Sequence, residues 1–147
     1  MEKDIDIVIY GATGFTGKLC VKYLSQNAKD LNWAIAGRSK TKLSQIAIRF
    51  APQTEILLAA GDDEEALDKI TERAKVIIST AGPFHRYGSS LVASCIKNQA
   101  HYVDITGETF WIKEMIDKHH DEAAKKGVRI IPSCGYDSLP SDLGVLF

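Results

Sequence analysis

The sequence lacks the features that mark several large classes of protein. Its formal net charge is −1, so it has no excess of positive charge for nucleic acid or an anionic membrane surface. No apolar run approaches the roughly 20 residues that cross a bilayer. The charged start, residues 1–4, leads into a strand pattern and does not resemble a signal peptide. We expect a cytoplasmic protein with no nucleic-acid partner and no membrane signal in this segment.

Cysteine is scarce and badly spaced for a structural role. The three residues Cys20, Cys95 and Cys134 are far apart, odd in number and form no C-x-x-C pair. This spacing argues against a disulfide framework and against a zinc motif. We therefore expect no metal site and a reducing compartment.

What the sequence does contain is the composition of an ordinary globular domain. Its 147 residues are 45% hydrophobic and 25% charged, enough for one domain with a full core. Short β-rich runs alternate with segments of helical period. The expected strands are 5–10, 33–36, 56–59, 76–80, 102–105 and 128–131; the expected helices are 14–26, 41–50, 64–73, 89–98 and 109–126. This alternation predicts an α/β fold, a three-layer doubly wound parallel sheet of about six strands.

The last ten residues carry signals for one more helix. Ser138 and Pro140 are typical of a helix start, and only about two turns follow. We expect residues 1–147 to be one dinucleotide-binding domain of a longer protein, with a C-terminal substrate domain missing. The alternative is a C-terminal helix that packs on the sheet.

A glycine turn follows the first strand. Gly11, Gly14 and Gly17 have a G-x-x-G-x-x-G spacing and open a helix that carries Leu19, Cys20, Tyr23 and Leu24. Helix N-termini bind phosphate, so we expect Gly11 to make the sharp turn, Gly14 to admit the pyrophosphate and Gly17 to pack the helix on the strand. The other expected contact residues in the turn are Ala12, Thr13, Phe15 and Thr16. The alternative is a tight turn without a ligand.

The residue after the second strand indicates which dinucleotide binds. NAD sites place a carboxylate about 20 residues past the glycines, but this position holds Gly37, followed by Arg38 and Ser39, with Lys42 one turn on. A guanidinium fork and a hydroxyl suit a 2′-phosphate. NADP is therefore favoured over NAD, the alternative for Arg38 being a solvated surface charge.

Two further loops lie on the expected ligand side of the sheet. Asp62 is expected near the adenine amine, or else as a helix cap together with Asp63. After the fourth strand the small residues of the next loop would let the nicotinamide approach the sheet. These are Thr80, Ala81, Gly82 and Pro83. Phe84 is either a wall for the nicotinamide or a core residue.

No catalytic residue can be assigned from the sequence. None of the five tyrosines has a lysine four residues on, which excludes the Tyr-x-x-x-Lys mechanism of short-chain dehydrogenases. Cys134 is a candidate nucleophile of the semialdehyde or acyl-phosphate dehydrogenase type. His85 is the best-placed titratable group, and Asp104 and Glu108 either bind substrate or support their loop.

Five segments together resemble the saccharopine dehydrogenase-like oxidoreductase family. They are residues 11–17, 36–39, 81–84, 102–108 and 134–144, and the aromatic after Cys134-Gly135 is closest to the trans-acting enoyl reductase-like branch. The resemblance implies an N-terminal NAD(P)-binding Rossmann domain followed by a second α/β domain. It also implies activities that include saccharopine reduction and trans-acting enoyl reduction.

Residues and resemblance together lead to one functional prediction with two alternatives. We predict an NADP-dependent oxidoreductase that transfers a hydride between NADPH and an imine, carbonyl or enoyl substrate. The substrate would be a small molecule or carrier-bound and held by the missing domain, so this domain alone would be inactive. A homodimer is left open. The alternatives are a non-catalytic dinucleotide sensor and a dehydrogenase that uses Cys134.

Overall fold

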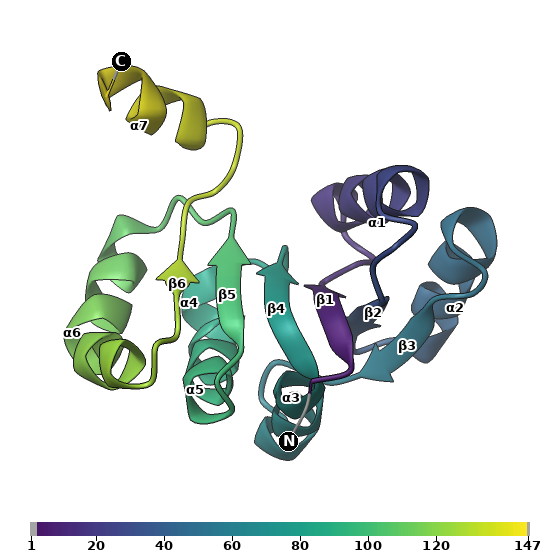
Figure 1. Cartoon of the computed structure of the whole chain (residues 1–147), viewed down its shortest axis with the longest axis horizontal. Coiled ribbons are helices and arrows are strands. Elements are labelled where there is room, and N and C mark those ends of the chain that lie inside the picture. The colour runs from purple at the N-terminus through teal and green to yellow at the C-terminus, as the bar shows by residue number, and fades with distance from the viewer. Residues whose placement is uncertain (1–2, 147) are drawn as a thin grey trace.

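The computed structural model describes residues 3–146, which form one sheet of six parallel strands with helices on both faces (Figure 1). The order across the sheet is β3-β2-β1-β4-β5-β6. The strands are β1 (Ile5–Tyr10), β2 (Trp33–Gly37), β3 (Glu55–Leu58), β4 (Ala74–Ser79), β5 (His101–Asp104) and β6 (Ile130–Ile131). The doubly wound parallel sheet predicted from the sequence is confirmed.

Two groups of helices cover opposite faces of this sheet. The helices are α1 (Phe15–Asn27), α2 (Lys40–Phe50), α3 (Glu64–Arg73), α4 (Phe84–Tyr87), α5 (Ser89–Lys97), α6 (Thr109–Lys125) and α7 (Leu139–Leu146). Side chains of α1 and α2 pack with Ile9 and Ile35, whereas those of α3, α5 and α6 pack with Val8 and Ile77. Neighbouring residues of a strand point to opposite faces, so the two cores lie on either side of the sheet.

Most predicted elements agree with the structure to within one or two residues. The first strand, 5–10, and the third helix, 64–73, have the predicted bounds. The last strand is shorter than predicted because the Val128 amide donates to the Ala123 carbonyl at 2.9 Å, which keeps Val128 in the C-terminal turn of α6. The short helix α4 was not predicted, since one turn is too brief to show a helical period.

Only some of the apolar residues of the first helix face the sheet. Leu19 and Tyr23 are 53% and 64% exposed, whereas Gly17 and Val21 are buried. Gly17 sets this phase, because its close contact with the glycine turn puts residues three and four positions further on against the sheet. Among the described residues, no helix combines the length and apolar character needed to cross a membrane.

Helix α7 forms where the sequence predicts it, but it does not pack on the sheet. No residue of α7 is buried, and the helix stands off the carboxyl end of β6 (Figure 1). The alternative of a C-terminal helix packed on the sheet is therefore wrong for the described residues.

Candidate functional site

The carboxyl ends of β1 and β4 lie where the strand order reverses, and we call this place the crevice, after the ligand-binding position of such sheets. These strands are neighbours, but the chain leaves them toward opposite faces of the sheet. Parallel α/β sheets bind ligands at such a switch point. The glycine turn after β1 and the loop after β4 meet here, since a Cβ on Gly11 would lie 2.8 Å from the Ala81 nitrogen. The two loops expected to bind the dinucleotide are thus in contact.

The glycine turn has a backbone that side chains would disrupt. Gly11 has a φ of +83°, in the left-handed region that favours glycine. A Cβ on Gly17 would lie 2.3 Å from the Gly11 carbonyl oxygen, and one on Gly14 would lie 3.3 Å from it. Gly11 therefore makes the sharp turn, and Gly17 lets the start of α1 approach the end of β1.

The N-terminus of α1 offers unpaired donors to an anion. Within residues 3–146, the amides of Thr13, Phe15, Thr16 and Gly17 donate no hydrogen bond. The N-cap residue Gly14 has no side chain to cap the helix, and the first turn contains no acidic residue. Free amides and the positive end of the helix dipole bind phosphate. The turn therefore fits the pyrophosphate of a dinucleotide.

Thr80 fastens the turn to the neighbouring strand. Its hydroxyl donates to the carbonyl oxygens of Tyr10, at 3.2 Å, and Gly11, at 3.1 Å. Its amide also donates to Tyr10 at 2.9 Å. Because its hydroxyl hydrogen is shared between these two carbonyl oxygens, Thr80 supports the glycine turn. The residues Ala81, Gly82 and Pro83 follow it in the loop after β4, which we call the crevice loop.

The residues expected at the adenosine end converge around Tyr10. Its hydroxyl donates to the Ala59 carbonyl at 3.4 Å. Burial raises the pKa of Tyr10 to about 12, with a further increase from the charge of Asp62 and a decrease from that of Arg38. Asp62 and Arg38 therefore lie close enough to Tyr10 to affect its pKa, so the carboxyl ends of β1, β2 and β3 lie near one another. Tyr10 was not singled out from the sequence, because its hydrophobic neighbours there indicate only a buried strand.

Arg38 is available for a ligand at this end of the crevice. It is exposed and forms no hydrogen bond or ion pair with the described residues. Ser39 caps α2 by accepting a hydrogen bond from the Lys42 amide at 3.5 Å, and Lys42 is exposed. A guanidinium, a hydroxyl and an ammonium beside a helix N-terminus suit a phosphate monoester.

Asp63, rather than Asp62, caps the helix that follows β3. The Asp63 carboxylate accepts a hydrogen bond from the Ala66 amide at 3.0 Å. Asp62 is exposed and makes no such bond. The capping alternative for Asp62 is therefore wrong, and its carboxylate is free to accept a donor from a ligand.

Glu108 holds the start of the short helix α4, which carries His85. Its carboxylate accepts hydrogen bonds from the Phe84 amide at 2.8 Å, the His85 amide at 2.9 Å and the His85 ring nitrogen Nδ1 at 2.6 Å. Burial alone would raise the pKa of Glu108, but these hydrogen bonds outweigh it and lower the pKa. Phe84 itself is buried against Trp111, with ring centroids 5.8 Å apart, so it is a core residue rather than a wall.

Asp104 supports the loops after β5 and β6. It is 1% exposed and accepts hydrogen bonds from the Tyr102 hydroxyl at 2.9 Å and the amides of Thr106 and Ser133, each at 3.0 Å. Burial raises the pKa of Asp104, and these donors oppose the increase. Ser133 also donates to the Thr106 carbonyl at 2.7 Å. Both carboxylates near the fifth strand thus support loops, and Ser133 is a supporting residue that the sequence did not indicate.

The environment of Cys134 does not favour a thiolate. Burial and the nearby Asp104 carboxylate both raise the pKa of the Cys134 thiol. The thiol donates to the Ile131 carbonyl at 3.3 Å. Nucleophilic cysteines need a lowered pKa and a base or positive charge beside them, which Cys134 lacks among the described residues.

Glu108→Gln should weaken the fold at neutral pH but not in acid. Because the folded-state pKa of Glu108 lies below the usual 4.5, its stabilisation is present above that value and is lost as the pH falls through the folded pKa. We expect the melting temperature at pH 7 to fall by about 3–8 °C. The difference should shrink as the pH falls through the folded-state pKa of Glu108, which lies below 4.5. Thermal unfolding followed by circular dichroism from pH 3.5 to 7 measures this.

Glu114→Gln is the matched control, since Glu114 is exposed in α6, the helix that Glu108 precedes as its N-cap residue. It should leave the melting temperature within about 1 °C at every pH. A Glu108→Gln deficit that stays constant across this range would contradict the role of the charged carboxylate.

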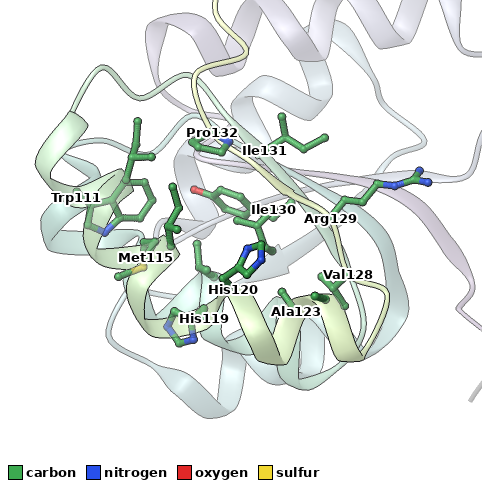
Figure 2. A pocket seen from close by; sticks show the side chains of 15 residues that line it. Trp111, Met115, His119, His120, Ala123, Val128, Arg129, Ile130, Ile131 and Pro132 are labelled. Carbon is green, nitrogen blue, oxygen red and sulfur yellow. The ribbon is translucent and has the colours of Figure 1, made fainter.

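A separate hollow lies at the other end of the sheet, between α6 and β6 (Figure 2). Its volume is about 320 Å³ and its lining is mostly apolar. The lining includes Trp111, Met115, Val128, Ile130 and Pro132. None of the residues of the glycine turn or the β4 loop lines it, so this hollow is distinct from the crevice.

Comparison with known proteins bears on the crevice directly. The family profile described as the saccharopine dehydrogenase NADP binding domain matches residues 7–131. This match covers the glycine turn, Arg38 and the loop after β4, and it identifies NADP as the cofactor. The donors at α1 and α2 fit that dinucleotide.

Longer relatives share the whole of this chain. A trans-acting enoyl reductase from Mycobacterium tuberculosis is 42% identical over 147 residues, which are 98% of this chain and 35% of the relative. A lipid droplet localized protein from Caenorhabditis elegans is 38% identical over 151 residues, with 97% and 35% covered. The chain therefore spans about a third of the length of these curated relatives.

A solved structure shares the fold. Apo saccharopine dehydrogenase (L-Glu forming) from Saccharomyces cerevisiae superposes with a TM-score of 0.80 at 20% identity. The match covers 97% of this chain and 30% of that one. At this identity the likeness supports the Rossmann-type sheet alone.

Proposed function

This chain belongs to the family of saccharopine dehydrogenase NADP-binding domains, and we propose that it is the dinucleotide-binding part of an oxidoreductase. The reaction is hydride transfer between NADPH and an imine, carbonyl or enoyl substrate, small or carrier-bound. Since the relatives are about three times as long, we assign the substrate contacts to a further domain. This domain alone is then inactive. Free, widely separated cysteines support a cytoplasmic location.

The observation that carries the proposal is that two anion-binding groups lie along one crevice, one made of backbone amides and the other of polar and cationic side chains. The free amides at the start of α1 would hold the pyrophosphate. Arg38, Ser39 and Lys42 would hold the 2′-phosphate, and no carboxylate occupies position 37 to take a ribose hydroxyl. The small side chains of the loop after β4 would leave room for the nicotinamide.

In this arrangement the chain holds the dinucleotide in position, and the dinucleotide supplies the chemistry. Bound NADPH supplies the hydride. Thr80 fixes the glycine turn, and Glu108 fixes the start of α4, which bears His85 after the crevice loop. His85 Nδ1 is bonded to Glu108, so Nε2 is the nitrogen left to meet a substrate group.

Two alternatives remain distinct from this proposal. A non-catalytic dinucleotide sensor would use the same cradle without turnover, and oxidation of NADPH by the longer polypeptide with any carbonyl, imine or enoyl substrate would reject it. A dehydrogenase based on Cys134 has less support, because burial keeps that thiol protonated at neutral pH.

Calorimetric titration of this chain with NADPH and NADH tests the proposal. We expect NADPH to bind with a Kd at least about tenfold lower than that of NADH, because only NADPH carries the phosphate that Arg38 would hold. Adenosine 2′,5′-bisphosphate should compete with NADPH. A folded chain that binds neither dinucleotide would sink the proposal.

A further inference from the structure

Half of one face of the sheet has no helix over it. Helices α1 and α2 cover β1, β2 and β3 on this face, whereas the same face of β4, β5 and β6 is open (Figure 1). Register identifies the side chains there. Ile78, Val103 and Ile131 are aligned with Ile9, which lies in the α1–α2 core, and Val76 is aligned with Ile7. We call Val76, Ile78, Val103 and Ile131 the bare half-face.

The four residues of the bare half-face are apolar and belong to neither core, and His101, which is aligned with Val76, lies on the same face of β5. None of the four is buried, and none packs against the buried clusters of the described chain. Ile131 is 47% exposed. The opposite face of the same strands is closed by α3, α5 and α6, which bury Ile77 and Tyr102. Parallel sheets are almost always covered on both faces, so this half-face lacks a layer.

Helix α7 lacks a partner as well. Its apolar residues Leu139, Leu143, Val145 and Leu146 are all exposed. A helix of eight residues is not stable in water without packing. Two apolar surfaces next to the end of β6 are therefore open, and both precede any part of the polypeptide that would follow this domain.

We propose that the bare half-face seats an amphipathic helix from the part of the polypeptide that the longer relatives have and this chain lacks. This chain spans only 35% of those relatives, so ample sequence is available. Three strands about 4.8 Å apart present a surface about 10 Å wide, the diameter of one helix. The inference rests on the proposed function to the extent that both require a longer polypeptide.

Such a helix joins the two parts of the enzyme at a definite place. The half-face ends at the carboxyl ends of β4 and β5, and the loop after β4 leads from there to α4, which carries His85. A helix seated there holds the substrate-bearing part against the open end of the crevice.

Thiol labelling of Val103→Cys tests the seat. The variant is made in this chain and in the polypeptide encoded by the complete gene, and iodoacetamide labelling is followed peptide by peptide, which separates it from the native cysteines. We expect labelling about a hundredfold slower in the complete polypeptide. Ile48→Cys, on the exposed side of α2, is the control and should label equally in both. Ile131→Cys serves as a second probe where Val103→Cys fails to fold.

Several outcomes overturn the inference. Equal labelling of Val103→Cys in both polypeptides does so, as does a complete gene product of only 147 residues. If labelling of Val103→Cys in this chain slows as the chain concentration rises, a second copy of the chain covers the half-face instead of the helix. NADPH titration of the same samples separates the two claims. Unprotected labelling with intact NADPH binding rejects only the helix, whereas loss of NADPH binding by the folded parent chain rejects the proposed function.

Discussion

Gly17→Ala is expected to destabilise this domain by at least about 3 kcal/mol, or about 10 °C in melting temperature. The added Cβ would lie 2.3 Å from the Gly11 carbonyl oxygen and 2.8 Å from the Ala12 Cα. Both are backbone atoms, so they cannot turn aside as a side chain would. Relief requires α1 to move away from the end of β1, which opens the close packing at the glycine turn.

The sign of this effect is informative because helix propensity acts the other way. Alanine inside a helix is favoured over glycine by about 1 kcal/mol, so only the clash makes Gly17→Ala harmful. Urea unfolding followed by circular dichroism measures the change. Gly107→Ala is the control, since a Cβ there meets nothing within 4 Å, and should alter stability by less than about 1 kcal/mol. A neutral or stabilising Gly17→Ala would contradict the close approach of α1.

The fold follows from the sequence where hydrophobic runs are long and uninterrupted. The strand of residues 5–10 and the helix of residues 64–73 have the predicted bounds because apolar period and capping residue agree there. Short elements are less legible. Strand β6 has two residues, and the apolar run that predicts it also serves the C-terminal turn of α6. The sequence does not show which side of α1 faces the sheet, because contact at Gly17, not the count of apolar residues, decides it.

The site could be predicted only where one continuous segment contains the whole motif. The glycine turn does so, because strand, turn and helix are contiguous. The group of Tyr10, Arg38 and Asp62 comes from the carboxyl-terminal regions of three different strands, and no local pattern predicts that they meet. The loop-supporting carboxylates Asp104 and Glu108 were found as candidates, but their roles depend on amides that only the folded chain brings to them.

Arg38→Ala is expected to convert a domain selective for NADPH into one that barely distinguishes the two dinucleotides. A charged hydrogen-bonded pair at a phosphate contributes about 1.5–3 kcal/mol, so the Kd for NADPH should rise about 10- to 100-fold. The Kd for NADH should stay within about twofold, because NADH has no 2′-phosphate for the guanidinium to hold. Calorimetric titration of the parent chain and of Arg38→Ala with NADPH and with NADH measures this change in selectivity.

Arg49→Ala is the matched control, because it removes the same charge from the same segment. Arg49 lies in the last turn of α2, with its guanidinium 5.0 Å from the centre of the Phe50 ring, whereas Arg38 lies just before that helix. A general electrostatic effect would appear in both variants and would fade with salt, whereas a specific phosphate contact is lost in only one. Arg38→Lys should retain part of the affinity, since it keeps the charge but not the planar fork. Equal weakening of NADPH and NADH by Arg38→Ala would place the guanidinium on a phosphate that both dinucleotides share.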